Sequence, residues 1–172
     1  MTIVATRITA LAIGATATIT KRRLAKSTAV ETVPTAPGRT SLAKGEIIEA
    51  ILLDKRPAHA GDAYLRFIPR TEMDIAVVSA GVNLTLDDKG AIKTARVALG
   101  AAAPTVLLVE EAGQVLVGSK LDEGTLERLA KICSGACRPI DDKRGTIEFR
   151  RKVAGVLAQR AAATAYKRAG GK

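Results

Sequence analysis

A short alternating segment and the charged corner after it organise the middle of the chain. Residues 63–68 alternate between two faces of an extended strand, with Leu65 and Phe67 opposite Arg66. Pro69 removes a backbone donor, so the strand is predicted to end there. The corner that follows holds Arg70, Glu72 and Asp74 before a second apolar run, 75–78. It is either a solvated turn with paired charges or a loop that a sheet presents to a ligand.

Upstream, the pattern predicts three further strands. Threonines alternate with apolar residues in 15–20, and 27–33 is a second extended segment. The basic cluster of residues 21–26 lies between them, which predicts a hairpin with a positively charged turn. After a Pro- and Gly-containing loop, 45–53 is the third strand. Residues 7–15 superficially resemble a short signal sequence, but we interpret them as strand and core.

Downstream, strands give way to helices. Residues 77–86 and 91–99 are predicted to form a hairpin closed by a polar turn that ends in Gly90, and 105–109 to add a third strand. A short helix is expected over 110–117. Asp122 is a plausible cap for a helix over 123–136, and Thr146 for a long helix to about Arg168. This order predicts an α+β fold, with a three-stranded antiparallel sheet packed by C-terminal helices.

Composition limits the function classes. At 172 residues with 47% hydrophobic residues, the chain can bury the core of one domain. Aromatic residues make up only 2%, which weakens a single-strand nucleic-acid function based on stacking. A net charge of +10 favours polyanions, acidic partners or phosphate-bearing cofactors without choosing among them. Two cysteines and no clear export segment suit a reducing cytosol, so we expect a cytoplasmic protein.

The side chains alone indicate no catalytic or metal site. Cys133 and Cys137 are one helical turn apart, but structural zinc requires four ligands and the single histidine, His59, is distant in sequence. Buried free cysteines are the better interpretation. The chain contains no Gly-x-Gly-x-x-Gly motif and no phosphate loop. The basic segment 143–172 can be a solvated helix face, a docking face for an acidic subunit or a nucleic-acid footprint.

Several segments together resemble a known family. They are Pro37–Gly38–Arg39–Thr40, Gly45–Glu46–Ile47–Ile48, Ala63–Phe67 with Arg70 and Met73–Val78, Ala95–Thr105, and Arg138–Arg151. In this order they resemble the flavin-bearing medium subunit of the xanthine dehydrogenase and carbon monoxide dehydrogenase family, the molybdenum hydroxylases. The resemblance extends over nearly the whole chain.

The resemblance implies a domain division and a cofactor. Residues 1–60 would be a remnant of the FAD-binding domain with its connection, and 61–172 the C-terminal α+β domain of the medium subunit. FAD would pass electrons from iron–sulfur clusters to an acceptor. A molybdopterin-binding large subunit and an iron–sulfur small subunit would be partners.

The resemblance also predicts an incomplete cofactor site. Family members carry glycine-rich phosphate-binding loops before this domain, and only the last strands of that region, roughly 10–33, are similar here. We therefore expect this chain alone to bind FAD weakly or not at all and to be inactive alone. A separate chain supplying the rest of the FAD site, a truncation and a fragment all stay open.

For particular residues the implication is narrower. Ile48 and Ile75 match apolar positions that pack against the flavin ring, and Arg66 matches a position, usually Lys, near its polar edge. Asp74 matches an Asp at the start of the loop, where it would orient the backbone. These four would be cofactor-binding, and no residue would be a catalytic acid or base.

The rival function is a flavin-free basic module that docks on an acidic subunit or nucleic acid. The basic residues Arg150, Arg151 and Lys152 bear on this choice. We expect them to serve packing and docking, since Glu148 and Phe149 interrupt the positive run.

Overall fold

The computed structural model describes residues 16–21, 24–71 and 73–171. The expectation for residues 7–15 therefore lies outside the described residues, as does the Arg22–Arg23 part of the basic turn. No helix in the part of the chain that the structure describes is long and apolar enough to cross a membrane.

The first strands form a small antiparallel sheet. Its order is β2 (Leu24–Ala29), β1 (Thr16–Lys21) and β5 (Ile47–Leu52). Two very short strands, β3 (Pro34–Ala36) and β4 (Arg39–Thr40), pair around a turn in which Gly38 has a positive φ of 69°.

One upstream strand differs from its prediction. The segment predicted as a strand over 27–33 leaves the extended conformation after Ala29 and forms the 3₁₀ turn η2 (Val30–Thr32). The Thr32 hydroxyl donates to the Ala29 carbonyl at 2.8 Å, a local bond that competes with strand pairing. Strand β2 instead begins earlier, at Leu24, so Lys26, which was predicted in the basic cluster between the strands, lies within β2.

The second sheet holds the predicted hairpin and is larger than predicted. Strands β7 (Val78–Leu86) and β8 (Ile92–Gly100) pair antiparallel around the Asp87–Gly90 turn, and β9 (Leu107–Leu108) pairs with β8. These are the three predicted strands. The alternating segment, β6 (Ala60–Phe67), adds a fourth by pairing with β7 over its whole length, so the sheet order is β6-β7-β8-β9.

Three helices follow the strands, as predicted. They are α1 (Glu110–Leu116), α2 (Glu123–Ala136) and α3 (Ile147–Arg168). The Asp122 side chain accepts a hydrogen bond from the Thr125 amide at 2.9 Å, and the Thr146 hydroxyl accepts one from the Phe149 amide at 3.2 Å. Both predicted caps therefore satisfy amides that have no partner within the helix.

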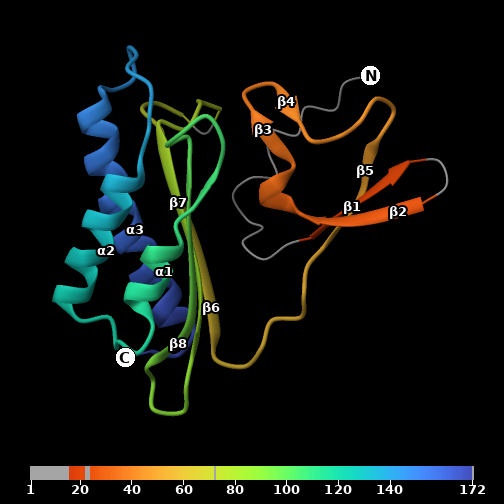
Figure 1. Ribbon diagram of the computed structural model, residues 1–172. Helices are drawn as coiled ribbons and strands as arrows, with labels where there is room; N and C mark the ends of the chain where they lie inside the picture. The colour runs from red at the N-terminus through yellow and green to blue at the C-terminus, as the bar shows by residue number, and fades with distance from the viewer. Residues whose placement is uncertain (1–15, 22–23, 72, 172) are drawn as a thin grey trace.

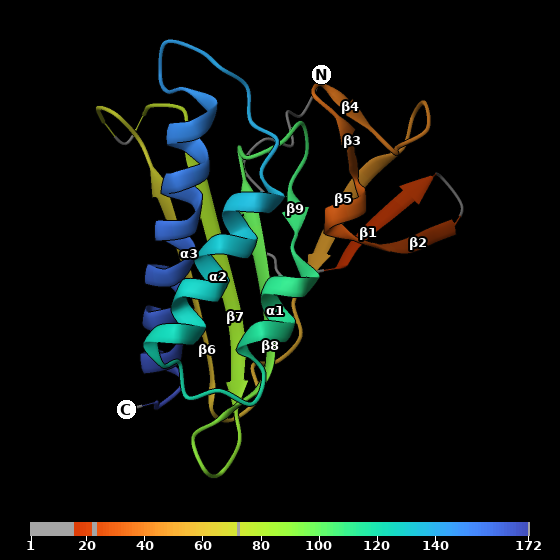
Figure 2. The same ribbon diagram turned by 60° about the vertical axis from the view of Figure 1, so that its left-hand side comes forward.

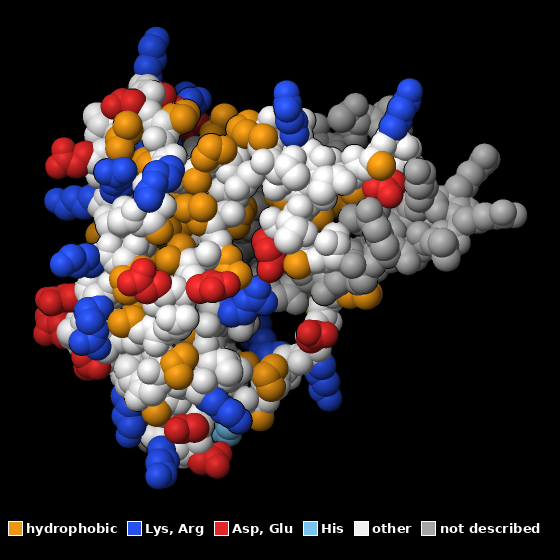
Figure 3. Space-filling model, in the orientation of Figure 1, with side chains coloured by type: hydrophobic (Ala, Val, Ile, Leu, Met, Phe, Trp, Pro, Cys, Tyr) orange, Lys and Arg blue, Asp and Glu red, His pale blue; other side chains and the backbone are white. Residues whose placement is uncertain are grey.

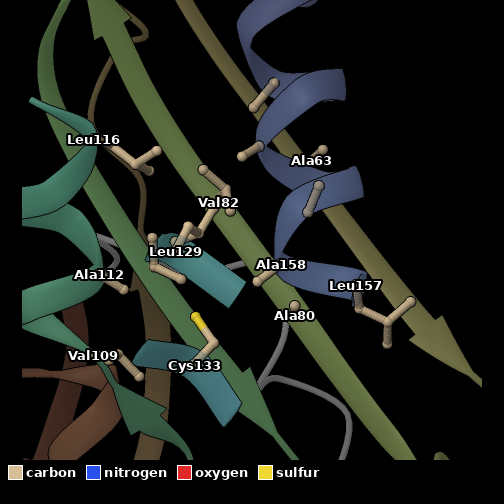
Figure 4. Close-up of a cluster of buried hydrophobic side chains, with 14 of the residues drawn as sticks. Ala63, Ala80, Val82, Val109, Ala112, Leu116, Leu129, Cys133, Leu157 and Ala158 are labelled. Atoms are coloured by element: carbon tan, nitrogen blue, oxygen red, sulfur yellow. The ribbon is translucent and has the colours of Figure 1, made fainter. Parts of the chain in front are cut away.

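The main core lies between this sheet and the helices. Ala80, Val82 and Leu84 alternate along β7 and are buried, as are Leu129 and Cys133 of α2. Figure 4 shows Ala80 and Val82 close to Leu129 and Cys133. Figures 1 and 2 show the helices as one layer on one side of the sheet. Few aromatic residues are needed because small side chains let α3 pack close to the strands. The buried alanines of α3 are Ala154, Ala158, Ala161, Ala162 and Ala165.

The three-stranded and four-stranded sheets are joined by residues 53–59, which form neither helix nor strand, and by a side-chain contact. Arg96 of β8 forms an ion pair with Glu31 of η2, with Nη2 and Oε1 3.0 Å apart. The smaller sheet is formed only by strands that precede this segment, and the larger sheet only by strands that follow it (Figure 1). The division of the chain into two domains near residue 60 stays a prediction.

Candidate flavin-facing site

The 68–76 loop, of which the structure describes 68–71 and 73–76, connects the edge strand β6 to its neighbour β7 at one end of the larger sheet. Its ends are tied together by the Val77 amide, which donates to the Phe67 carbonyl at 2.9 Å. Within the loop, the Asp74 amide donates to the Thr71 carbonyl at 2.9 Å. Strand β6 ends before Pro69, as predicted, because the chain must turn where a ladder donor is missing. The loop is thus a closed turn presented by a rigid hairpin.

Asp74 organises the backbone of this loop. Its side chain is only 4% exposed and accepts hydrogen bonds from Arg70, Nε to Oδ2 at 2.9 Å and Nη2 to Oδ1 at 3.3 Å. Oδ1 also accepts from the Ile75 amide at 2.9 Å. The Arg70 hydrogen bond lowers the pKa of the Asp74 carboxyl below its usual value. The carboxylate is therefore ionised at neutral pH and orients the peptide that carries Ile75.

Ile75 and Arg66 lie at the same end of the hairpin. The Ile75 side chain is 66% exposed, and Met73 beside it is 87% exposed. Arg66 is exposed on β6, and its neighbours Leu65 and Phe67 pack against the core on the other face. The predicted alternation of β6 is confirmed. The structure therefore places Arg66, Asp74 and Ile75 at one end of the larger sheet.

Ile48 lies elsewhere. It is on β5 in the smaller sheet, where it is half-buried and packs against Val33. Figures 1 and 2 place β5 on the opposite side of the molecule from the helical layer. Its contact with a flavin ring stays a prediction, and the ring would have to extend between the two sheets to touch both Ile48 and Ile75.

Sequence reasoning did not single out Arg150 as part of this site. Its side chain is 4% exposed, although it lies in a run of basic residues. Its guanidinium donates from Nη1 to the Val77 carbonyl at 2.6 Å and from Nη2 to Asp142 at 2.6 Å. The expected packing role of Arg150 is therefore observed. The signal in the sequence was weak, since a run of basic residues does not indicate which of them is buried.

The cysteines are buried and free, as interpreted from the sequence. Burial raises the pKa of the Cys133 thiol to about 12, which leaves it protonated and unreactive. Among the described residues, no group of three or more His, Cys, Asp and Glu side chains is arranged to hold a metal ion.

The basic residues do not form a uniform track on the face that Figure 3 shows. There, Lys and Arg side chains are interspersed with Asp and Glu over the helical layer. Arg151 and Lys152 are exposed, so both stay available for docking. A mixed surface of this kind suits a specific protein contact better than a sequence-blind polyanion.

The larger sheet, β6 to β9, thus carries a helical layer on one face and a charged loop at its end. The family model described as the CO dehydrogenase flavoprotein C-terminal domain matches residues 63–165. The chain belongs to this family, the flavoprotein medium subunits of the molybdenum hydroxylases.

Individual proteins with names of this kind are similar to the chain in sequence. The chain is 38% identical over 130 residues to the carbon monoxide dehydrogenase medium chain of Afipia carboxidovorans, covering 76% of this chain and 44% of the relative. It is 30% identical over 139 residues to a xanthine dehydrogenase FAD-binding subunit of Escherichia coli, covering 80% of this chain and 47% of the relative. The chain thus spans less than half the length of these two relatives.

Solved structures show the same fold. Reconstituted CO dehydrogenase from Oligotropha carboxidovorans superposes with a TM-score of 0.84 at 34% identity, covering 90% of this chain and 54% of that chain. Quinoline 2-oxidoreductase from Pseudomonas putida superposes with a TM-score of 0.79 at 25% identity, covering 90% and 53%.

Proposed function

We propose that this chain forms the ring-side wall of an FAD site in the medium subunit of a molybdenum hydroxylase. The observation that carries the proposal is the 66% exposure of Ile75 in a loop whose backbone is fixed by the buried Asp74 side chain. An apolar side chain held in solvent by a rigid loop suits a flat apolar ligand face.

The residues present fit the ring end of a flavin. Ile75 offers an apolar contact, and Arg66 offers a permanent positive charge at the same end of the hairpin. A cation there favours the negatively charged reduced ring, and Arg offers a planar fork where the family usually has Lys. FAD, when bound, supplies the electron transfer, and the protein supplies binding and electrostatics.

The residues do not fit the pyrophosphate end. The sequence holds no Gly-x-Gly-x-x-Gly motif and no phosphate loop, which are the usual backbone sites for a diphosphate. The proposal therefore assigns ring contacts to this chain and leaves the phosphate contacts to other residues or another chain.

The assembly is part of the same proposal. A molybdopterin-binding large subunit would oxidise the substrate, an iron–sulfur small subunit would relay electrons, and the flavin would pass them to an acceptor in the cytoplasm. The exposed Arg151 and Lys152 of α3 are available to dock such a subunit. The relatives named as dehydrogenase subunits support this arrangement.

The test compares a complete cofactor with its ring alone. Backbone amide NMR signals of the chain are followed as FAD or lumiflavin, a flavin ring without the ribityl chain and everything attached to it, is added. We expect both to bind weakly, with similar affinity, and to shift signals of residues 66–77. Ile75→Asp and Arg66→Ala should reduce the lumiflavin shifts by about fivefold or more, since each removes one contact of about 1 kcal/mol.

The matched control is Val117→Asp, which changes another exposed apolar residue, 49% exposed, at the end of α1. Its lumiflavin shifts should equal those of the unchanged chain. Lumiflavin shifts that are absent or unaffected by Ile75→Asp would overturn the ring-wall proposal. Stoichiometric FAD binding far tighter than lumiflavin binding would instead show that this chain also holds the part of FAD beyond the ring.

A further inference from the structure

The 68–76 loop is anchored at both ends by the first turn of α3. Its upstream end is Phe67, whose ring meets the ring of Phe149 edge to face, with centroids 5.8 Å apart. Its downstream end is Val77, whose carbonyl accepts from Arg150 Nη1 at 2.6 Å. Figures 1 and 2 both show the loop beside this end of α3. Adjacent residues of one helix therefore hold the two ends of one loop.

Arg150 binds three acceptors, one at Val77 and two in the 142–145 turn. Besides the Val77 carbonyl, its Nη2 donates to Asp142 Oδ1 at 2.6 Å and its Nε to the Gly145 carbonyl at 3.2 Å. Burying an arginine is costly, and an apolar side chain of similar volume often stabilises a fold as well or better. A planar guanidinium, however, can fix three acceptors in one geometry, and neither an apolar residue nor Lys can.

The turn before α3 is shaped to permit this contact. The Asp142 carboxylate also accepts from the Arg144 amide at 2.8 Å, which closes the 142–145 turn. A Cβ added to Gly145 would lie 2.9 Å from the Phe149 ring and 3.6 Å from a Val77 methyl group. A larger residue at position 145 would therefore push the Phe149 ring away from its place beside the turn.

The same residues are close to the Asp74 end of the loop. The positive charge of Arg144 contributes to lowering the pKa of Asp74, after the larger effect of Arg70. The 142–150 segment thus contacts the loop ends directly and acts electrostatically on the carboxylate that orients Ile75.

We infer that Arg150 and Phe149 are positioning residues that fix the 68–76 loop, and through it Asp74 and Ile75, in the geometry presented to a flavin ring. The loop-fixing part stands on contacts within the chain. Only its consequence for a flavin rests on the proposed function.

The test measures the loop without any flavin. Amide hydrogen exchange is compared for the full chain and its Arg150→Lys, Arg150→Met and Phe149→Ala variants. We expect exchange at Asp74 and Val77, whose amides are bonded within the loop and across its ends, to accelerate about tenfold or more in each variant. Exchange at Val82 and Val97, in the centre of the sheet, should be unchanged. Arg160→Met, which changes an exposed residue further along the same helix, is the matched control and should change neither.

Phe149 is 41% exposed, so Phe149→Ala keeps the inference testable where a change at the buried Arg150 prevents folding. Unchanged loop exchange in the folded variants would overturn the inference, as would equal acceleration across the sheet. A second measurement repeats the lumiflavin titration with Arg150→Lys. The chemical-shift changes that lumiflavin causes at residues 66–77 should become several-fold smaller. If loop exchange is faster in the variants but even the unchanged chain does not bind lumiflavin, the anchoring of the loop is supported and the proposed function is contradicted.

Discussion

The three-stranded and four-stranded sheets of this protein differ in what covers them. In the larger unit, helices cover β6 to β9, and Leu84, Ile92, Leu99 and Leu129 are fully buried. Among the side chains described between residues 28 and 59, Val33 is the only buried hydrophobic one. The edge strand β5 and the residue after it expose Ile47, Leu52 and Leu53 at 63%, 55% and 70%.

The difference shows that an alternating pattern produces a core only where a second layer covers its apolar face. In the larger unit the alanine-rich face of α3 provides that layer. The folding free energy of the chain should therefore be concentrated in the β6–α3 unit, and the candidate loop takes its rigidity from there.

The largest expected effect separates the two units directly. Leu84→Ala should lower the free energy of unfolding by about 2–5 kcal/mol, because it leaves a cavity in a closed core. The matched pair is Val82→Ala, expected to cost about 2 kcal/mol, and Val33→Ala, expected to cost about 1 kcal/mol or less. Both valines are buried, but Val33 packs only against partly buried side chains, which can close the cavity. Urea denaturation followed by circular dichroism measures all three. Equal losses for the two valine variants would remove the proposed difference between the units.

A smaller effect examines how closely the helices pack. A Cβ added to Gly155 of α3 would lie 2.8 Å from the Ala130 carbonyl oxygen of α2. Gly155→Ala should therefore destabilise the fold by about 1–3 kcal/mol, the usual cost of overpacking. Gly135→Ala is the matched control, since its Cβ would meet no atom within 4 Å in the same helical pair. It should stabilise the fold by about 0.5–1 kcal/mol, and thermal unfolding of both variants decides between these outcomes.

The smallest effect is a pH dependence confined to the larger unit. Hydrogen bonds from Thr125, first from its side chain, lower the pKa of Asp122 below its usual value. A lowered pKa in the folded state adds stability above the unfolded pKa, and that stability is lost as pH falls through the folded value.

Asp122→Asn keeps a capping side chain but removes the titration. The unchanged chain should lose stability relative to this variant as pH falls below about 4, and the two should run parallel above it. Asp88→Asn, in the exposed β7–β8 turn, is the control. Denaturation at a series of pH values measures the difference. Curves that stay parallel into the acid range would contradict the assigned role of Asp122.

Local signals in the sequence determined most of the larger unit. Alternation in 63–68, the polar turn before Ala91, and the caps Asp122 and Thr146 each depend on neighbours a few residues away. The helices and the hairpin were therefore predictable nearly to the residue. The loop with Asp74 and Ile75 was identified by Pro69, which ends the preceding strand, and by the family resemblance.

Tertiary structure alone decided the rest. The pairing of β6 with β7, the burial of Arg150 and its bond to Val77 join positions far apart in the chain. Residues 150–152 are all basic in sequence, yet the first is buried and the next two are exposed, because helical geometry directs adjacent side chains to different faces. Local sequence fixes which residues form a helix, but the cost of burying a charge depends on what surrounds it, and only the folded chain supplies those surroundings.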